Sequence, residues 1–188
     1  MRCVPIFLLF ICLVSCADHK PGLDFQAYQN DSAGNASQPA AIEHIIARIK
    51  QIDAASISDS VYLENEQFLE HTPDGGGSLT AYLEKDEVVK ITEWIGLSYG
   101  VTVHDFYFDK DALIFVNEKQ EYFAVSVAGI DHERFDKAYQ GHYFYQNEDL
   151  IKYSDSGFKR FSINVKEQAA AFIESAHAYQ KLIREQRK

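Results

Sequence analysis

The stretch that decides the fold is residues 78–116, which read SLTAYLEKDEVVKITEWIGLSYGVTVHDFYFDKDALIFV. It contains runs of β-branched and aromatic residues, the types that are enriched in strands. Short turns separate the runs, among them Lys85-Asp86 and the polar Asp109-Lys110-Asp111. Loops this short join antiparallel strands, because a parallel crossover needs a dozen or more residues. This stretch therefore predicts an antiparallel β-meander.

The strand pattern extends to both sides of this stretch. A glycine-rich turn at residues 73–77 precedes it, since glycine adopts positive φ without steric cost. Residues 130–139 have a mixed pattern for which we expect a short helix. The remaining expected strands are residues 60–71, 121–127, 142–146, 150–153 and 159–163.

Two helices are expected at the ends of this region. Residues 39–55 carry isoleucines in one helical stripe. A second helix is expected to begin after Asn164, a good capping residue with Glu167 three positions later. Together these patterns predict an α+β fold, with a meander sheet of about five to eight strands flanked by an N-terminal and a C-terminal helix. The isoleucine stripe of the helix expected over residues 39–55 consists of Ile42, Ile45, Ile46, Ile49 and Ile52.

Composition excludes several classes of protein. The chain has 188 residues, of which 46% are hydrophobic, so it is too apolar for a disordered chain. With 18 Lys+Arg against 28 Asp+Glu, its formal charge is −10. This excess of acids, with no basic patch, argues against nucleic acid as a partner. We expect the many acids of the strand region, among them Glu93, to form a solvated face.

The first residues have the organisation of a secretory signal peptide. Arg2 supplies a short positive region, and the apolar stretch from Val4 to Val14 follows it. This stretch is well short of the roughly 20 apolar residues that span a bilayer. All three cysteines, Cys3, Cys12 and Cys16, lie in this segment.

The end of the signal segment, Leu13-Val14-Ser15-Cys16, resembles the lipobox of bacterial lipoproteins. The resemblance implies cleavage before Cys16 and attachment of acyl chains such as palmitate to that cysteine. Two or three acyl chains anchor a protein stably, whereas one holds only marginally. The expected organisation is a signal peptide over residues 1–15, a lipidated cysteine with a flexible tether over 16–38, and a single α+β domain over 39–188.

The central block combines a glycine-rich hairpin with aromatic-rich strands. A Gly-Gly hairpin at residues 75–77 is followed by aromatic-rich strands, including Asp105-Phe106-Tyr107-Phe108. In this respect the chain is similar to small uncharacterised lipoproteins of Bacteroidota. That resemblance implies location and fold but no activity.

We find no motif for a reaction, a metal or a cofactor, and we predict none. The seven histidines include no His-Glu-x-x-His pair. The Asp109-Lys110-Asp111 segment lacks the glycine that a calcium loop requires at its sixth position, where Ile114 stands. The three glycines at 75–77 lack the Lys-Ser/Thr of a phosphate-binding loop.

The aromatic residues are the most unusual feature, with 13 Phe, 11 Tyr and 1 Trp. Buried tyrosine hydroxyls need hydrogen-bond partners, so this many tyrosines suggests that some are exposed. We therefore expect a Tyr-rich sheet face that binds a ligand through Tyr107, Tyr143 and Tyr145. His104 is a further candidate for ligand binding, although alternation along the strand places it on the opposite face from Asp105 and Tyr107.

These observations predict a lipid-anchored protein of the cell envelope. The domain would lie in the periplasm or at the cell surface, anchored to the inner or outer membrane. Its function would be non-enzymatic binding of a protein, peptide or glycan, or assistance in assembly. The alternative is a small envelope hydrolase that acts on a glycan or peptide polymer through acids or His104.

Overall fold

The computed structural model describes residues 37–161 and 164–188. The described residues form one compact unit with seven strands in one antiparallel sheet, each paired with its neighbours in the sequence. The α+β meander predicted from the sequence is therefore confirmed. In chain order the elements are α1 (Ser37–Ala54), β1 (Asp59–Glu64), α2 (Asn65–Phe68), β2 (Gly77–Glu84), β3 (Glu87–Leu97), β4 (Gly100–Asp109), β5 (Ala112–Ser126), β6 (Gly129–Gln146), β7 (Asp149–Gly157) and α3 (Val165–Gln186).

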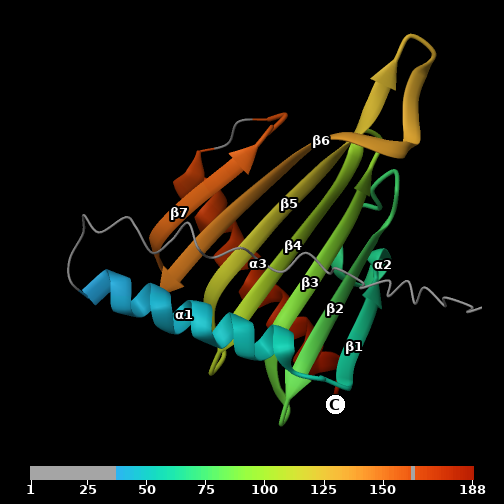
Figure 1. Ribbon diagram of the computed structural model, residues 1–188. Coiled ribbons are helices and arrows are strands. Elements are labelled where there is room, and N and C mark those ends of the chain that lie inside the picture. The colour runs from blue at the N-terminus through green and yellow to red at the C-terminus, as the bar shows by residue number, and fades with distance from the viewer. Residues whose placement is uncertain (1–36, 162–163) are drawn as a thin grey trace, which may run out of the picture. The chain divides into compact units, whose positions relative to one another are not determined.

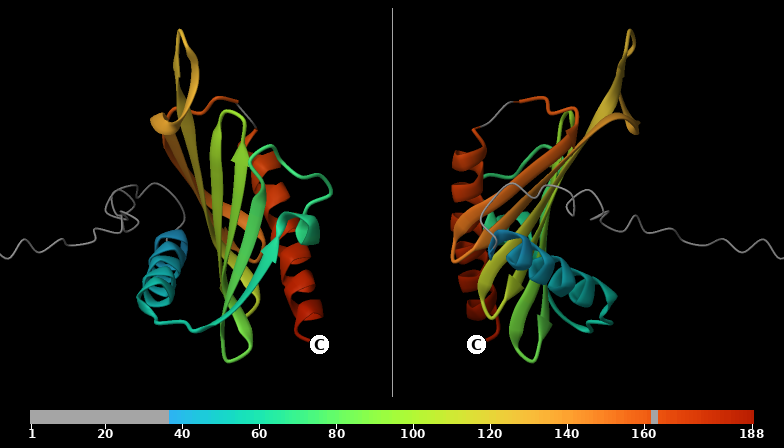
Figure 2. Two further views of the ribbon diagram at one scale, coloured as in Figure 1. Left: turned by 90° about the vertical axis from the view of Figure 1, so that its right-hand side faces the viewer. Right: turned by 60° about the vertical axis from the view of Figure 1, so that its left-hand side comes forward.

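Two helices lie on opposite sides of the sheet, as Figures 1 and 2 show. Both were expected from the sequence, and the cap at Asn164 is confirmed, because its side chain accepts a hydrogen bond from the Lys166 amide at 2.9 Å. We call the side of the sheet that carries α3 the α3 face and the side that carries α1 the α1 face.

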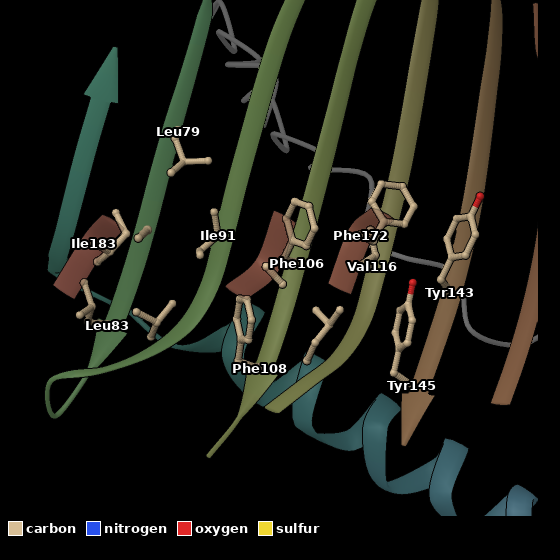
Figure 3. Close-up of a cluster of buried hydrophobic side chains, with 14 of the residues drawn as sticks. Leu79, Leu83, Ile91, Phe106, Phe108, Val116, Tyr143, Tyr145, Phe172 and Ile183 are labelled. Carbon is tan, nitrogen blue, oxygen red and sulfur yellow. The ribbon is translucent and has the colours of Figure 1, made fainter. Parts of the chain in front are cut away.

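The main hydrophobic core lies between the sheet and α3 (Figure 3). Leu79, Ile91, Phe106 and Val116 supply it from four neighbouring strands, and Phe172 supplies it from the helix. All five side chains are almost completely buried. Burial of this much apolar surface is the dominant force that holds α3 on the sheet.

The α1 face is covered over a smaller part. Ile45, Ile49 and Ile52 of α1 are buried, which confirms the stripe predicted from the sequence. Arg48 anchors the helix near the sheet turns, through contacts with Glu84 at 3.3 Å and Asp109 at 3.6 Å. Figure 1 shows α1 crossing the strands close to these turns, so the helix covers one end of the face.

Three of the strand connections are two-residue turns with both residues at positive φ. These are Lys85-Asp86, Lys110-Asp111 and Asn147-Glu148. This conformation matches the right-handed twist of paired strands, which is why it dominates short hairpins. The first two turns were expected from the sequence.

Other expectations were wrong in their details. The strand expected over 60–71 ends at Glu64, where the chain enters α2 and Gln67 accepts a hydrogen bond from the Glu64 amide. The helix expected over 130–139 is part of β6, because pairing with β5 overrides its local pattern. The strand expected over 159–163 is not formed at residues 159–161, and the other two residues lie outside the described chain.

Candidate functional site

The tyrosines expected to bind a ligand are buried. Tyr107, Tyr143 and Tyr145 are 1%, 0% and 0% exposed, so the expectation of an exposed Tyr row at these positions is wrong. Figure 3 shows Tyr143 and Tyr145 directed into the core. Their hydroxyls have partners within the protein, since Tyr143 donates to Glu118 and Tyr145 to the Ala169 carbonyl.

Tyr107 lies on the opposite face, beneath α1. Its hydroxyl donates to the Asp53 carboxylate and accepts from Lys90 Nζ at 2.8 Å. Burial and the neighbouring carboxylates of Asp105 and Asp53 raise its pKa. The side chain therefore joins α1 to the sheet as a neutral phenol and has no hydroxyl free for a ligand.

His104 is held in a buried pair on the α3 face. Its Nδ1 lies 2.5 Å from the Glu93 carboxylate, which also accepts a hydrogen bond from Tyr179 of α3. Burial alone would raise the pKa of Glu93, but the hydrogen bond and charge of His104 and the bond from Tyr179 hold it below its usual value. As expected, His104 and Asp105 point to opposite faces.

A second buried carboxylate lies beside His104 in the register, because His104 pairs with Glu118 of β5. Glu118 is 1% exposed and accepts from Tyr143 at 2.9 Å, from Lys159 at 3.1 Å and from Gln120 at 2.6 Å. Buried carboxylates of this kind are stable only when hydrogen-bonded and paired. The expectation of a solvated acidic face is therefore wrong for Glu93, and Glu118 carried no sequence signal that distinguished it from the exposed acids.

Glu93, His104 and Glu118 form a buried row that is largely enclosed by packed side chains. Three surface hollows lie elsewhere: between α2 and α3, beside residues 55–59, and between α1 and the β4–β5 turn. None of these three is lined by Glu93, His104 or Glu118. Rings of Phe106 and Phe172 cover His104 instead. The row therefore serves to fix α3 and the strands.

The most exposed apolar surface lies at the far end of β5 and β6. Of eight large hydrophobic residues that are exposed in the described chain, six lie between residues 125 and 161. Four of them belong to a projecting hairpin, residues 123–135, which we call the arm (Figures 1 and 2). These four are Val125, Val127, Ile130 and Phe135.

The geometry of the arm is set by an irregular register. Ala124 pairs with Asp131 but Phe123 pairs with Phe135, so three residues of β6 have no counterpart on β5. Bulges of this kind bend a strand and change the direction of its next residues. Phe123 stacks on Phe135 with ring centroids 5.1 Å apart, which stabilises the base of the arm.

An aromatic cluster lies beside the base of the arm, formed by Tyr99, Tyr122, Phe158 and Phe161. Tyr99 packs against Tyr122 and Phe161, and Tyr122 against Phe158. Arg160 lies over the Tyr99 ring, with its guanidinium carbon 4.7 Å from the centroid. Phe158 and Phe161 are 46% and 55% exposed. The sequence signal for this region was the uncharged run 124–130, AVSVAGI, which sequence analysis did not single out.

The remaining predicted site, Cys16, lies outside the described residues, as do the signal segment and most of the tether. Among the described residues, no three His, Cys, Asp or Glu side chains are placed to hold a metal ion together. No helix in the described part of the chain is long and apolar enough to cross a bilayer.

Comparison with known proteins gives no relative from which a role could be carried over. No protein-family model, no curated protein and no solved structure matches the chain.

Proposed function

We propose that this protein is a lipid-anchored binding module of the cell envelope, and that it contacts a protein partner through the arm. The amino-terminal resemblance to a lipobox supports the anchor. The single observation that carries the binding role is the concentration of exposed apolar side chains on the arm and beside it. Contiguous apolar surface on a soluble domain marks an interaction site more often than scattered single residues do.

The chemistry of the arm favours a protein over a lipid surface. Its tip, residues 124–130, carries no charge, and Val127 is fully exposed in the turn. Behind the tip, acids and bases are mixed: Asp131, Glu133, Arg134, Asp136 and Lys137. An apolar centre with a polar rim of both signs is the usual composition of a protein interface. Insertion into an anionic bilayer favours a basic surround, and the chain as a whole has a formal charge of −10.

The experiment is site-specific photo-crosslinking in the native envelope. A benzoylphenylalanine is placed at position 127 in the full-length protein and, as a matched control, at Glu174 on the exposed side of α3. We expect position 127 to crosslink to one protein, and the yield to fall at least tenfold when Ile130→Ser is added. Equal crosslinking from both positions, or crosslinks from 127 to lipid or to a second copy only, would contradict the proposal.

The anchor has its own test. Cells that express the full chain are labelled with a palmitate analogue, and the protein is recovered by an affinity tag. We expect label on the wild type and none on Cys16→Ala. Label that remains on Cys16→Ala would refute lipidation at that position and would leave the crosslinking result at the arm unaffected.

A further inference from the structure

A second, separate surface lies on the α1 face, beyond the end that α1 covers. It comprises two neighbouring register rows of side chains that point away from the α3 core. We call these two rows the open rows. The first row runs through Thr92, Asp105 and Asn117, and the second through Trp94, Val103, Lys119 and Gln140.

Trp94 is the aromatic member of the open rows and the only tryptophan in the chain. Its side chain is 37% exposed on the sheet. The ring lies against Gly96, where an added Cβ would be 2.8 Å from the indole Cη2. Glycine at this position thus lets a large apolar ring lie close to the strand while part of its surface remains open to solvent.

The polar members of the open rows are already fixed by hydrogen bonds. Thr92 donates to Asp105 at 2.7 Å, Asn117 to Asp105 at 3.4 Å, and Gln140 to the Asn117 carbonyl oxygen at 3.0 Å. This chain of bonds crosses four strands, from β3 to β6. Asn117 is only 7% exposed and holds Asp105 and Gln140 in place. The half-buried Gln140 amide still has hydrogen-bonding capacity beyond these bonds, because an amide carries two donors and two acceptor lone pairs.

Both lysines near this surface lie in ion pairs. Lys90 lies 3.1 Å from Asp53 and 3.7 Å from Asp105, and Lys119 lies 3.1 Å from Glu121. Because these two lysines face three acids, neither is an unpaired cation that would attract an anionic ligand. The surface therefore offers an apolar ring beside neutral and charge-compensated hydrogen-bonding groups.

We propose that the open rows bind a neutral oligosaccharide. A sugar ring has an apolar face of C–H groups, which matches Trp94, and a rim of hydroxyls, each a donor and an acceptor, which matches the partly exposed Asp105 and Gln140. Neighbouring strands are about 4.8 Å apart, so the distance from Trp94 on β3 to Gln140 on β6 is about 14 Å. That distance requires a ligand of several sugar units, not a monosaccharide.

Rigid placement supports this assignment. The groups lie on strands, and their bonds to one another hold their orientations before a ligand arrives, which lowers the entropic cost of binding. This proposal rests on residues that the arm does not include. The oligosaccharide site and the protein contact therefore stand or fall separately.

The test uses Trp94 as a built-in reporter. The full-length protein is purified in a detergent without a sugar headgroup, and tryptophan fluorescence is titrated with hexasaccharides of glucose, mannose and N-acetylglucosamine in turn. We expect at least one of them to give a saturable change in intensity with a shift to shorter wavelength. Calorimetry with the same sugar measures the affinity independently of the fluorophore.

Variants locate the site. Gln140→Ala removes one partly exposed hydrogen-bonding group of about 1 kcal/mol, so the affinity should fall about fivefold. Trp94→Ala should abolish the heat of binding, while Glu174→Gln on the exposed side of α3 should leave it unchanged. Circular dichroism confirms that each variant is folded.

Three results would overturn the proposal. The first is absence of both a fluorescence change and heat with all three hexasaccharides. The second is undiminished affinity in the folded Trp94→Ala and Gln140→Ala variants. The third is a response limited to an anionic polymer such as heparin and lost in high salt.

Discussion

The two faces of the sheet are made by the same strands, yet they hold their polar residues in different ways. On the α3 face, Glu93, His104 and Glu118 lie beneath a helix and are almost or largely buried. On the α1 face, Asp105 and Asn117 are similarly enclosed, and Lys90 joins Asp105 to Asp53 of α1. That chain of hydrogen bonds, however, extends through Asn117 to the partly exposed Gln140, in the same register row as the 37% exposed Trp94. The enclosed parts of both rows stabilise the fold, and the exposed end of the second row can also contact a ligand.

The largest loss of stability should come from a substitution at the centre of the α3 face. Phe172 packs against the rings of His104, Phe106 and Tyr143. Phe172→Ala should lower the free energy of unfolding by about 3–5 kcal/mol, because it leaves a cavity in a packed core. Urea unfolding followed by circular dichroism measures this change. Ala170→Ser, on the exposed side of the same helix, is the control, and equal stability of the two variants would contradict the described position of α3.

The next largest change in the free energy of unfolding involves a residue of the α1 face and depends on pH. Burial lowers the pKa of His142 to about 4, from an ordinary value of 6.5. Between these two values the unfolded chain binds a proton that the folded chain does not, so acidification should lower the free energy of unfolding, by at most about 3 kcal/mol. Above pH 6.5 this effect is absent.

His142→Gln removes that titration and should flatten the pH dependence in this window. The measurement is the urea midpoint of both proteins at pH 7.5 and at pH 4.5. Glu93 adds a loss of stability at more acidic pH, since its lowered pKa means that its contribution is complete above the ordinary carboxyl pKa and is lost below it. Parallel pH profiles for wild type and His142→Gln would show that His142 is not the source.

A smaller effect compares two tyrosines on the α3 face. Tyr143→Phe removes a buried hydrogen bond to the Glu118 carboxylate and should cost about 1–3 kcal/mol. Tyr153→Phe makes the same chemical change at a hydroxyl that donates to the exposed Asp155 carboxylate and lies 2.9 Å from the Tyr139 hydroxyl, and it should cost less because the charged partner remains solvated. Equal losses in urea unfolding would mean that burial does not set the strength of these bonds.

The smallest effect on stability is expected at the arm. Val127→Ser changes a fully exposed side chain, so the free energy of unfolding should stay within about 0.5 kcal/mol of the wild type. The matched change Val116→Ser, in the α3 core, should be strongly destabilising because it places a hydroxyl among apolar side chains without a hydrogen-bond partner. If Val127→Ser also destabilised the protein, the arm would be part of the fold and not a surface for a partner.

Local sequence was sufficient to predict the meander, because short turns such as Lys85-Asp86 fix the direction of the next strand. It was not sufficient at residues 130–139, where a charged, irregular pattern indicates a helix and only pairing with β5 makes it a strand. Nor does the sequence show which tyrosines are exposed. The partner of Tyr143 is 25 residues away, and the burial of Tyr145 depends on α3, so alternation along β6 alone could not reveal either.

The consecutive order of the strands has a consequence for how the chain folds as it is made. Each strand pairs only with strands next to it in the sequence, so the sheet can grow from its N-terminal edge as the chain emerges, without waiting for distant segments. The helix that covers the main core is the last element. Until residues 165–186 are available, the apolar side of the growing sheet has no cover from α3. A chain truncated before this helix should therefore be a substrate for chaperones and proteases, even though all seven strands are present.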